Sequence, residues 1–319
     1  MLKDLPLLAV AIVWGSSYLT AKDLTVAGGV LALLALRYLI SAAAMLPVLA
    51  IRRPRRPSRR EIAVGTLLGL TQALVLAFET YGVAHTSATN AGVLISLTIL
   101  LTPTLEGVIG RRFLPPGFFV AAAVAVGGVV LLVAGPGLRA PSAGDALILV
   151  AAMIRAVHVT LSGHLARGRD YDTVTLTTVQ TVVGAVLFTA AAGPTLFTAA
   201  AGPTLGAAVS AYGRNQWLAV TYLALGCSVF AFLVQLWAIR RTSAARASLL
   251  LGTEPVWAVL IGVGLGGEHL TWLTLAGIAL VLGGTFAGQR VEANVRRELR
   301  KPIGSVEWQP RVPEKMTGS

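Results

Sequence analysis

The feature that most restricts the fold of this chain is a series of ten apolar segments, each about 20 residues long. Their approximate bounds are 5–22, 29–51, 62–84, 88–109, 116–135, 145–166, 173–193, 215–239, 245–265 and 270–288. A helix of about 20 apolar residues crosses the hydrocarbon core of a bilayer, and a spanning segment must pair its own backbone polar groups. We therefore predict an all-α polytopic membrane protein with ten transmembrane helices.

The composition agrees with a membrane protein and excludes several other classes. The chain of 319 residues is 55% hydrophobic and 13% charged, with a mean hydropathy of +0.75, whereas soluble domains average about 25% charged residues. The net charge of +12 lies in short basic runs between apolar segments. We therefore expect a lipid bilayer and no nucleic acid as partner. The single cysteine, Cys227, excludes an intramolecular disulfide and a cysteine metal site.

The basic residues alternate between the two sides of the predicted membrane. One side holds the runs after the second, fourth, sixth and eighth segments and the C-terminal tail; it includes Arg52, Arg53, Arg55, Arg56, Arg59, Arg60, Arg111, Arg112, Arg167, Arg169, Arg240, Arg241 and Arg246. The other side holds only Lys22, Arg139 and Arg214. Loops rich in Arg and Lys remain in the cytoplasm, so we expect a plasma-membrane protein with both termini cytoplasmic. The first segment has no cleavage site and is interpreted as a retained span.

An internal repeat divides the chain into two related halves. Thr86-Ser87-Ala88 recurs as Thr242-Ser243-Ala244, and the pair Gly127-Gly128 recurs as Gly283-Gly284, both at a spacing of 156 residues. Five helices per half is an odd number, so the second half is inserted in the opposite orientation. This inverted repeat is the plan of many secondary transporters, whose substrate site lies at the midplane between the halves.

The predicted domains follow from the repeat. Residues 1–139 form the first five-helix repeat, residues 140–289 the second, inverted repeat, and residues 290–319 a polar cytoplasmic tail that we expect to be largely disordered. A tandem copy of nine residues, 188–196 and 197–205, lengthens an external loop, and we interpret it as a tolerated insertion.

Ionisable residues inside the apolar segments are costly and are candidates for a functional site. Arg155 lies near the middle of the sixth segment, with His158 and Ser162 on the same helical face. Two interpretations of Arg155 remain open: it offers a cation to a carboxylate of the substrate, or it pairs with Glu254 or Glu79. His158 is either a proton shuttle or a hydrogen-bonded packing residue.

Glu254 precedes Pro255 in the middle of the ninth segment, where proline weakens the helix. Its carboxylate is either a proton-coupling group or one member of a permanent ion pair with Arg37 or Arg155. Glu79 is a third proton-coupling candidate, beside Glu254 and His158. It corresponds to Gln235 in the repeat, and both positions are polar, as expected for the lining of a shared cavity.

Further polar residues complete the predicted substrate site. Gln72 lies on the same helical face as Glu79, and Arg37 in the second segment is either a cavity residue or a structural anchor. Trp14 and Ser17 in the first segment, with Gln180 in the seventh, either bind polar substrate groups or join helices by hydrogen bonds.

Several of these motifs together resemble one known family. WGSSY at 14–18, the arginine of LRYLISA at 36–42, YGVAHTSATNAG at 81–92 and TEPVWAVLIGVGLGGEHLT at 253–271 are similar to the EamA-like branch of the drug/metabolite transporter superfamily. The resemblance covers about residues 5–288. It implies ten helices in two inverted repeats around a central cavity, and a secondary carrier, often an exporter of amino acids or other small metabolites. Members often carry an aromatic residue where this chain has Arg155.

These observations lead to one main functional hypothesis and two alternatives. We expect a secondary-active exporter of small polar metabolites or amino acids that works by alternating access, and coupling to protons is left open. The alternatives are an uptake permease of the same fold and a membrane-embedded enzyme or non-transporting protein. The sequence contains none of the common catalytic or nucleotide-binding motifs, so we expect no enzyme, no cofactor and no metal. A monomer and a homodimer both remain open.

Overall fold

The computed structural model describes residues 4–52, 56–86, 91, 94–134, 142–192, 205–266 and 271–298, and within these ranges it contains helices and no strand. In the first part of the chain the helices are α1 (Leu5–Gly15), α2 (Ser17–Gly28), α3 (Val30–Arg52), α4 (Arg59–His85), α6 (Thr98–Gly110) and α7 (Pro116–Ala134). In the second part they are α8 (Ala143–Ala166), α9 (Thr173–Ala192), α11 (Leu205–Ala211), α12 (Arg214–Ala224), the π-helix η2 (Leu225–Phe230), α13 (Ala231–Arg241), α14 (Ala244–Leu251), α15 (Glu254–Gly266) and α16 (Trp272–Glu298).

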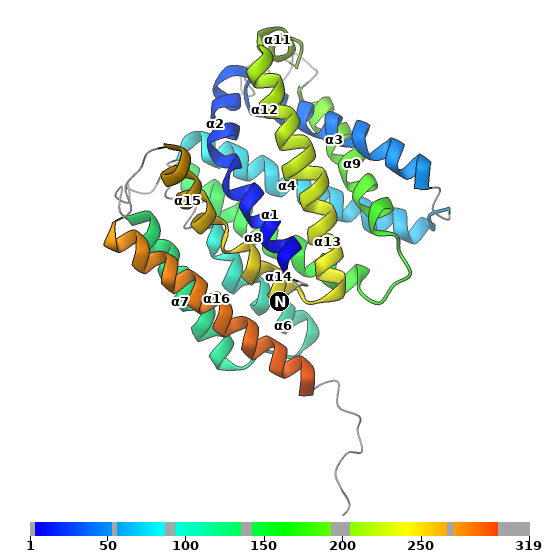
Figure 1. Cartoon of the computed structure of the whole chain (residues 1–319). Coiled ribbons are helices and arrows are strands. Elements are labelled where there is room, and N and C mark those ends of the chain that lie inside the picture. Colours follow the sequence, from blue (N-terminus) through cyan, green and yellow to red (C-terminus); the bar gives the residue numbers. More distant parts are fainter. Residues whose placement is uncertain are drawn as a thin grey trace, which may run out of the picture.

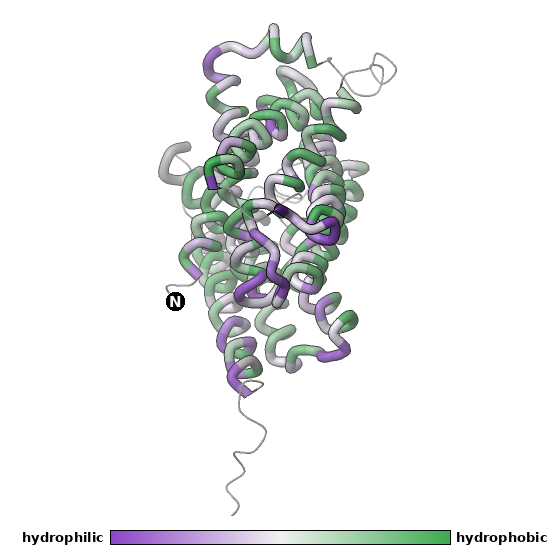
Figure 2. Tube along the Cα trace, turned by 90° about the vertical axis from the view of Figure 1, so that its right-hand side faces the viewer, coloured by the Kyte–Doolittle hydropathy of each residue, from purple (hydrophilic) through white to green (hydrophobic). Residues whose placement is uncertain are grey.

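The described helices confirm an all-helical membrane protein. Seven of them, some formed by consecutive elements, are long and apolar enough to cross a bilayer, and three shorter helices are also apolar. Figure 2 shows that the chain is mostly hydrophobic along its helices, while hydrophilic residues gather towards helix ends and connections. Many large apolar side chains are exposed on the outside of the bundle, as is required of a surface that faces lipid and not water.

Contacts between helices that are far apart in the sequence hold the bundle together. Helix α4 packs against α8 and α9, and α3 packs against α9. Helices α7 and α16 lie side by side along one flank (Figure 1). Helix α1 crosses the front and contacts α13, α14 and α15. Helix α14 contacts α1, α6, α8, α13 and α16, so it lies at the centre of these packings.

Three interruptions lie in the helices near this centre. Helix α14 ends at Leu251, and after two intervening residues α15 begins with Glu254 and Pro255, since proline fits the first turn of a helix but not its interior. Ser16 separates α1 from α2, and the π-helix η2 interrupts α12 and α13. The prediction that the ninth segment is weakened near Pro255 is confirmed, with the break on its N-terminal side.

The packing of α7 on α16 is reciprocal across the repeat. A Cβ atom on Gly128 would lie 2.6 Å from Val281 N and 2.8 Å from Gly277 O. A Cβ atom on Gly284 would lie 2.6 Å from Ala121 O and 2.7 Å from Ala125 N. Adding 156 to 121, 125 and 128 gives 277, 281 and 284, so the two contacts are the same contact seen from each half. The recurring glycines are therefore explained by the close approach of two backbones.

The predicted tail and the duplicated segment each lie partly within described helices. Helix α16 continues to Glu298, so the boundary predicted at 289/290 falls inside a helix and the first nine residues of the predicted tail are helical. Residues 299–319 lie outside the described residues. Most of the duplicated segment, residues 193–204, also lies outside them, while residues 188–192 belong to α9.

The glycine contact predicts a difference between neighbouring positions. Gly128→Ala should lower the thermal stability in detergent, because its new methyl group meets backbone atoms of α16 that cannot rotate away; overpacking of this kind costs about 1–3 kcal/mol. Gly127→Ala is the matched control, since nothing lies within 4 Å of its Cβ position. Melting followed by size-exclusion chromatography checks both variants, and equal melting temperatures would contradict the close approach.

Candidate substrate site

Arg155 of α8 is the centre of a charged cluster drawn from four helices. Its guanidinium group forms an ion pair with Glu79 of α4. Its other terminal nitrogen lies 3.9 Å from Glu254 Oε2 at the start of α15. The guanidinium carbon also lies 5.3 Å from the centre of the Trp14 ring of α1, close enough for a cation–π interaction.

The cluster is nearly closed off from the outside. The side chains of Arg155 and Glu79 are 14% and 12% exposed, and that of Glu254 is 6% exposed. A buried ion is costly unless it is paired and hydrogen-bonded. One cation between two carboxylates and an aromatic face therefore reduces the cost of placing three charges inside the bundle. Both pairings that the sequence left open for Arg155, with Glu79 and with Glu254, are present.

The π-helix η2 holds Trp14 and Arg37 in place. Trp14 Nε1 donates a hydrogen bond of 3.0 Å to the carbonyl of Cys227, and Arg37 donates to the same carbonyl at 3.2 Å. Arg37 Nε also donates to Ser228 Oγ at 2.7 Å. A π-helical turn shifts backbone carbonyls out of the regular α-helical pattern, which allows this carbonyl to accept from two side chains. The geometry of Arg37 is thus that of a structural anchor between α3 and η2.

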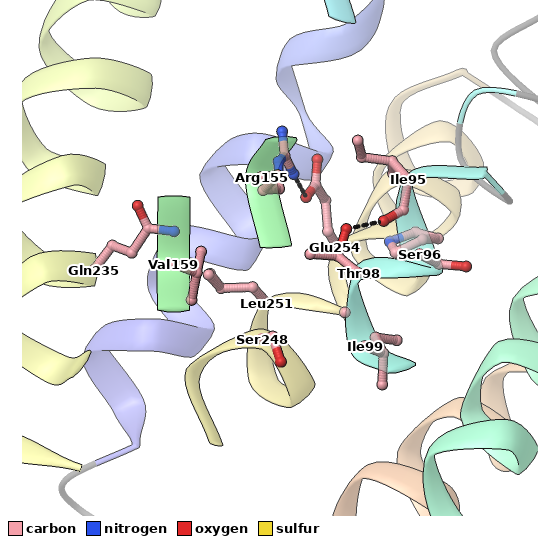
Figure 3. A pocket seen from close by; sticks show the side chains of 12 residues that line it. Ile95, Ser96, Thr98, Ile99, Arg155, Val159, Gln235, Ser248, Leu251 and Glu254 are labelled. Carbon is pink, nitrogen blue, oxygen red and sulfur yellow. Dashed lines mark hydrogen bonds and ion pairs between the residues drawn. The ribbon is translucent and has the colours of Figure 1, made fainter. Parts of the chain in front are cut away.

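A small central cavity lies beside the charged cluster (Figure 3). It has a volume of about 30 Å³, which is room for one or two waters. Its lining comes from α6 and the residues before it, α8, α13, α14 and the start of α15: Ile95, Ser96, Thr98, Ile99, Arg155, Val159, Gln235, Ser248, Leu251, Gly252, Glu254 and Pro255. The structure therefore shows the centre in a closed state, too small for a metabolite.

The polar lining contains pairs of positions related by the repeat. Glu79 corresponds to Gln235 and Thr98 to Glu254, each at the spacing of 156 residues. Within each of these pairs one member carries a charge and the other is neutral. The site is therefore built from equivalent positions but is electrostatically asymmetric.

Trp14 and Arg155 are related in a different register, at a spacing of 141 residues and not 156. Each follows, by ten residues, an aspartate at the start of its helix, Asp4 before α1 and Asp145 in α8. An aromatic ring and a guanidinium group thus occupy matching positions of α1 and α8, and they contact each other.

The predicted residues separate into three groups. Arg155, Gln235 and Glu254 line the central cavity, and Glu79 and Trp14 reach it through Arg155. His158 is buried, and its Nδ1 lies 2.8 Å from Thr71 Oγ1 of α4, so it joins α8 to α4 and is not part of the cavity lining. Arg37, which is bound to η2, is also absent from this lining, and so are the other three predicted residues, Ser17, Gln72 and Gln180.

Local contacts explain two of these three residues. Ser17 Oγ donates to Trp14 O at 2.7 Å, within its own turn of the chain. Gln180 lies where α9 packs on α4: a Cβ atom on Gly69 would lie 3.0 Å from its Cα atom. Gln72 is buried.

Sequence reasoning missed part of the lining. Ser96, Thr98 and Ser248 are polar residues of the cavity that the sequence analysis did not select. Thr98 could have been predicted, because the spacing of 156 residues relates it to Glu254. The apolar residues Ile95, Ile99, Val159 and Leu251 have no distinguishing signal, since isoleucine, valine and leucine fill every segment of this chain.

The arrangement can recognise a small molecule that carries both charges. A guanidinium group binds a carboxylate through two parallel hydrogen bonds, and the carboxylates of Glu79 and Glu254 suit an ammonium group. Among the described residues there is no group of three side chains that would hold a metal ion.

Comparison with known proteins agrees with this class of site. The model of the EamA-like transporter family matches residues 1–134 and 142–287. The chain belongs to this family and is a multi-pass membrane transporter, which points away from an enzyme. The resemblance stated from the sequence motifs is thereby confirmed.

Individual relatives agree with the family match. The chain is 29% identical to the "Uncharacterized inner membrane transporter YedA" of Escherichia coli (strain K12) over 284 residues, or 86% of this chain and 88% of that protein. It is equally similar to the protein of the same name from Escherichia coli O157:H7. A solved structure described as "Crystal structure of protein" matches with a TM-score of 0.73 over 94% of this chain and 99% of the other, at 20% identity, which shows that the fold is shared.

The charged cluster predicts unequal effects of removing its members. Arg155→Met should destabilise the folded protein by about 3–5 kcal/mol, because it leaves two buried carboxylates without their cation. Glu79→Gln should cost less, because Arg155 keeps Glu254 as a partner. Thermal unfolding in detergent measures both. Arg167→Met is the control, since its ion pair with Glu106 is 38% and 29% exposed and such pairs contribute little. A larger loss for Glu79→Gln than for Arg155→Met would contradict this account of the cluster.

Proposed function

We propose that this transporter is a secondary carrier that exports small polar metabolites, with amino acids as the best-fitting class, by alternating access. The observation that carries the proposal is the cluster of Arg155, Glu79 and Glu254 beside a closed central cavity and a helix break. Binding energy is available for a solute that carries a carboxylate and an ammonium group, because both can replace contacts that the cluster makes within itself.

The proposed architecture is ten membrane-spanning helices in two inverted five-helix repeats. The reciprocal glycine contacts of α7 and α16 support a two-fold relation between the halves, and so do the equivalent positions of Glu79 and Gln235. The arginine-rich ends of the helices favour a cytoplasmic location for that side and for both termini. The name of the YedA relatives favours the inner membrane.

The proposed mechanism begins with competition for Arg155. A substrate carboxylate binds the guanidinium group, and the substrate ammonium group binds Glu254, whose contact with Arg155 is the longer of the two ion pairs. Separation of Arg155 from Glu254 frees the start of α15 to move about the break at Gly252–Thr253. The cavity must enlarge in this step, since its present volume admits only water.

Coupling to protons is a further part of the proposal. Glu254 is the best-placed group, because it lines the cavity and its neighbour Arg155 is also the proposed substrate ligand. Glu79 is a second candidate through the same arginine. His158 is less suited, because it contacts Thr71 on the side of α8 that faces α4.

Export from whole bacteria tests the proposal. Cells that overproduce the wild-type protein should release one or more small metabolites at a higher rate than empty-vector cells. Arg155→Ala and Glu254→Gln should reduce this excess at least tenfold, since each removes a charged contact worth about 1.5–3 kcal/mol, while the protein remains in the membrane.

The control is Arg59→Ala, which removes an exposed arginine at the start of α4, away from the central cavity. It should export at nearly the wild-type rate. Normal export by both Arg155→Ala and Glu254→Gln would remove the cluster from the mechanism. No release above empty-vector cells, followed by no uptake of labelled solutes, would remove the transport proposal itself.

A further inference from the structure

A second charged cluster lies at the arginine-rich end of the helices, away from the central cavity. Arg246 of α14 binds Asp4 with two hydrogen bonds, from Nε at 3.0 Å and from a terminal nitrogen at 2.9 Å. Its other terminal nitrogen donates to Glu292 Oε2 of α16 at 3.1 Å. Three helices that are far apart in sequence, α1, α14 and α16, are thus joined through one guanidinium group.

The cluster is built into the fold and not laid on its surface. The side chain of Glu292 is 2% exposed, and those of Asp4 and Arg246 are 10% and 16% exposed. Ser243 donates to the second oxygen of Glu292 at 2.8 Å and accepts a hydrogen bond of 3.0 Å from Arg246 N. Since Ser243 is the N-cap of α14, the first turn of α14 is fixed to α16 at two points.

This first turn separates two spaces of very different size. A wide pocket of about 660 Å³, here called the vestibule, lies at the arginine-rich end, and its lining includes Glu106, Ser243, Ala245 and Glu292. Ser248, three residues after Ala245, already lines the central cavity of about 30 Å³. Three residues of helix correspond to about 4.5 Å along its axis. One turn of α14, together with the turn of α6 between Ile99 and Pro103, therefore lies between the vestibule and the central cavity.

We infer that Asp4, Arg246 and Glu292 form a latch that closes the transport path at the arginine-rich end, and that the latch must break before the central cavity opens to the vestibule. The inference rests on the proposed transport function. The latch positions α14, and through α14 it positions Ser248, Leu251 and the break before Glu254. Movement of α14 away from α1 and α16 would join the two spaces without unfolding a helix.

The opposite end has a matching closure. Asp145 of α8 precedes Arg155 by ten residues, as Asp4 precedes Trp14. It accepts a hydrogen bond from Thr86 Oγ1 at the end of α4, and its other oxygen accepts one of 2.7 Å from Ser142 N. Thr86 corresponds to Thr242, next to the N-cap of α14. Each half thus carries an aspartate at the start of its first helix that closes one end. Both closures are formed here, in agreement with the small central cavity.

Thiol labelling tests the latch without any substrate. The native cysteine is replaced by Cys227→Ser, and Ser248→Cys places a single reporter thiol in the central cavity. A membrane-impermeant maleimide is applied to right-side-out and to inside-out membrane vesicles. Glu292→Gln should raise the labelling rate at least tenfold in one vesicle orientation and not in the other, because it removes a charged hydrogen bond worth about 1.5–3 kcal/mol.

Two further variants make the result decisive. Asp4→Asn should act in the same vesicle orientation as Glu292→Gln, and it replaces Glu292→Gln if that variant does not fold. Asp145→Asn is the matched control at the opposite end and should not raise labelling in that orientation. Unchanged rates in the two latch variants, or equal increases in both orientations, would overturn the latch.

The outcome also separates the latch from the transport proposal. The latch variants could label faster in one vesicle orientation while the protein moves no solute. That result would support the latch and contradict the proposed transport. A wild-type protein that exports solute, with latch variants that neither label faster nor export differently, would remove the latch alone.

Discussion

The structure depends on how three charges are kept inside a bundle that is otherwise apolar. Arg155 is stabilised by two carboxylates and the face of Trp14, and these partners come from helices in both halves of the chain. Any motion of the halves therefore changes the electrostatic energy of Arg155. In the proposed mechanism this ion is the point of control, because a charged solute substitutes for one of its neighbours and permits another arrangement.

The same principle operates at the two ends of the molecule. Arg246 is satisfied by Asp4 and Glu292, and Asp145 is satisfied by Thr86 and Ser142. The contact of Asp4 joins the start of α1 to the start of α14. The contact of Asp145 joins the start of α8 to the end of α4.

Much of this molecule was predictable from its sequence, for identifiable reasons. Apolar segments of about 20 residues leave few alternatives to membrane helices, Pro255 marked the break in the ninth segment, and the spacing of 156 residues matched Gly128 with Gly284. The partners of Arg155 were reduced to Glu79 or Glu254, but not to both. The role of Glu292 was hidden, because a glutamate beyond the last apolar segment has the pattern of a solvated tail. The apolar lining of the cavity was also hidden, since contacts among similar residues depend on helix rotation, which hydropathy does not specify in an all-apolar helix.

The central claim is that equivalent positions of the two halves surround one charged site, and moving a carboxylate across that site tests it most directly. With the same amount of protein in the membrane as for the wild type, Glu79→Gln should reduce solute export at least tenfold. The double variant Glu79→Gln/Gln235→Glu returns a carboxylate to the cavity at the equivalent position of the other half. When the variants are measured side by side, the double variant should regain a large part of the export that Glu79→Gln loses. Export as low in the double variant as in Glu79→Gln, with both proteins folded in the membrane, would contradict the claim.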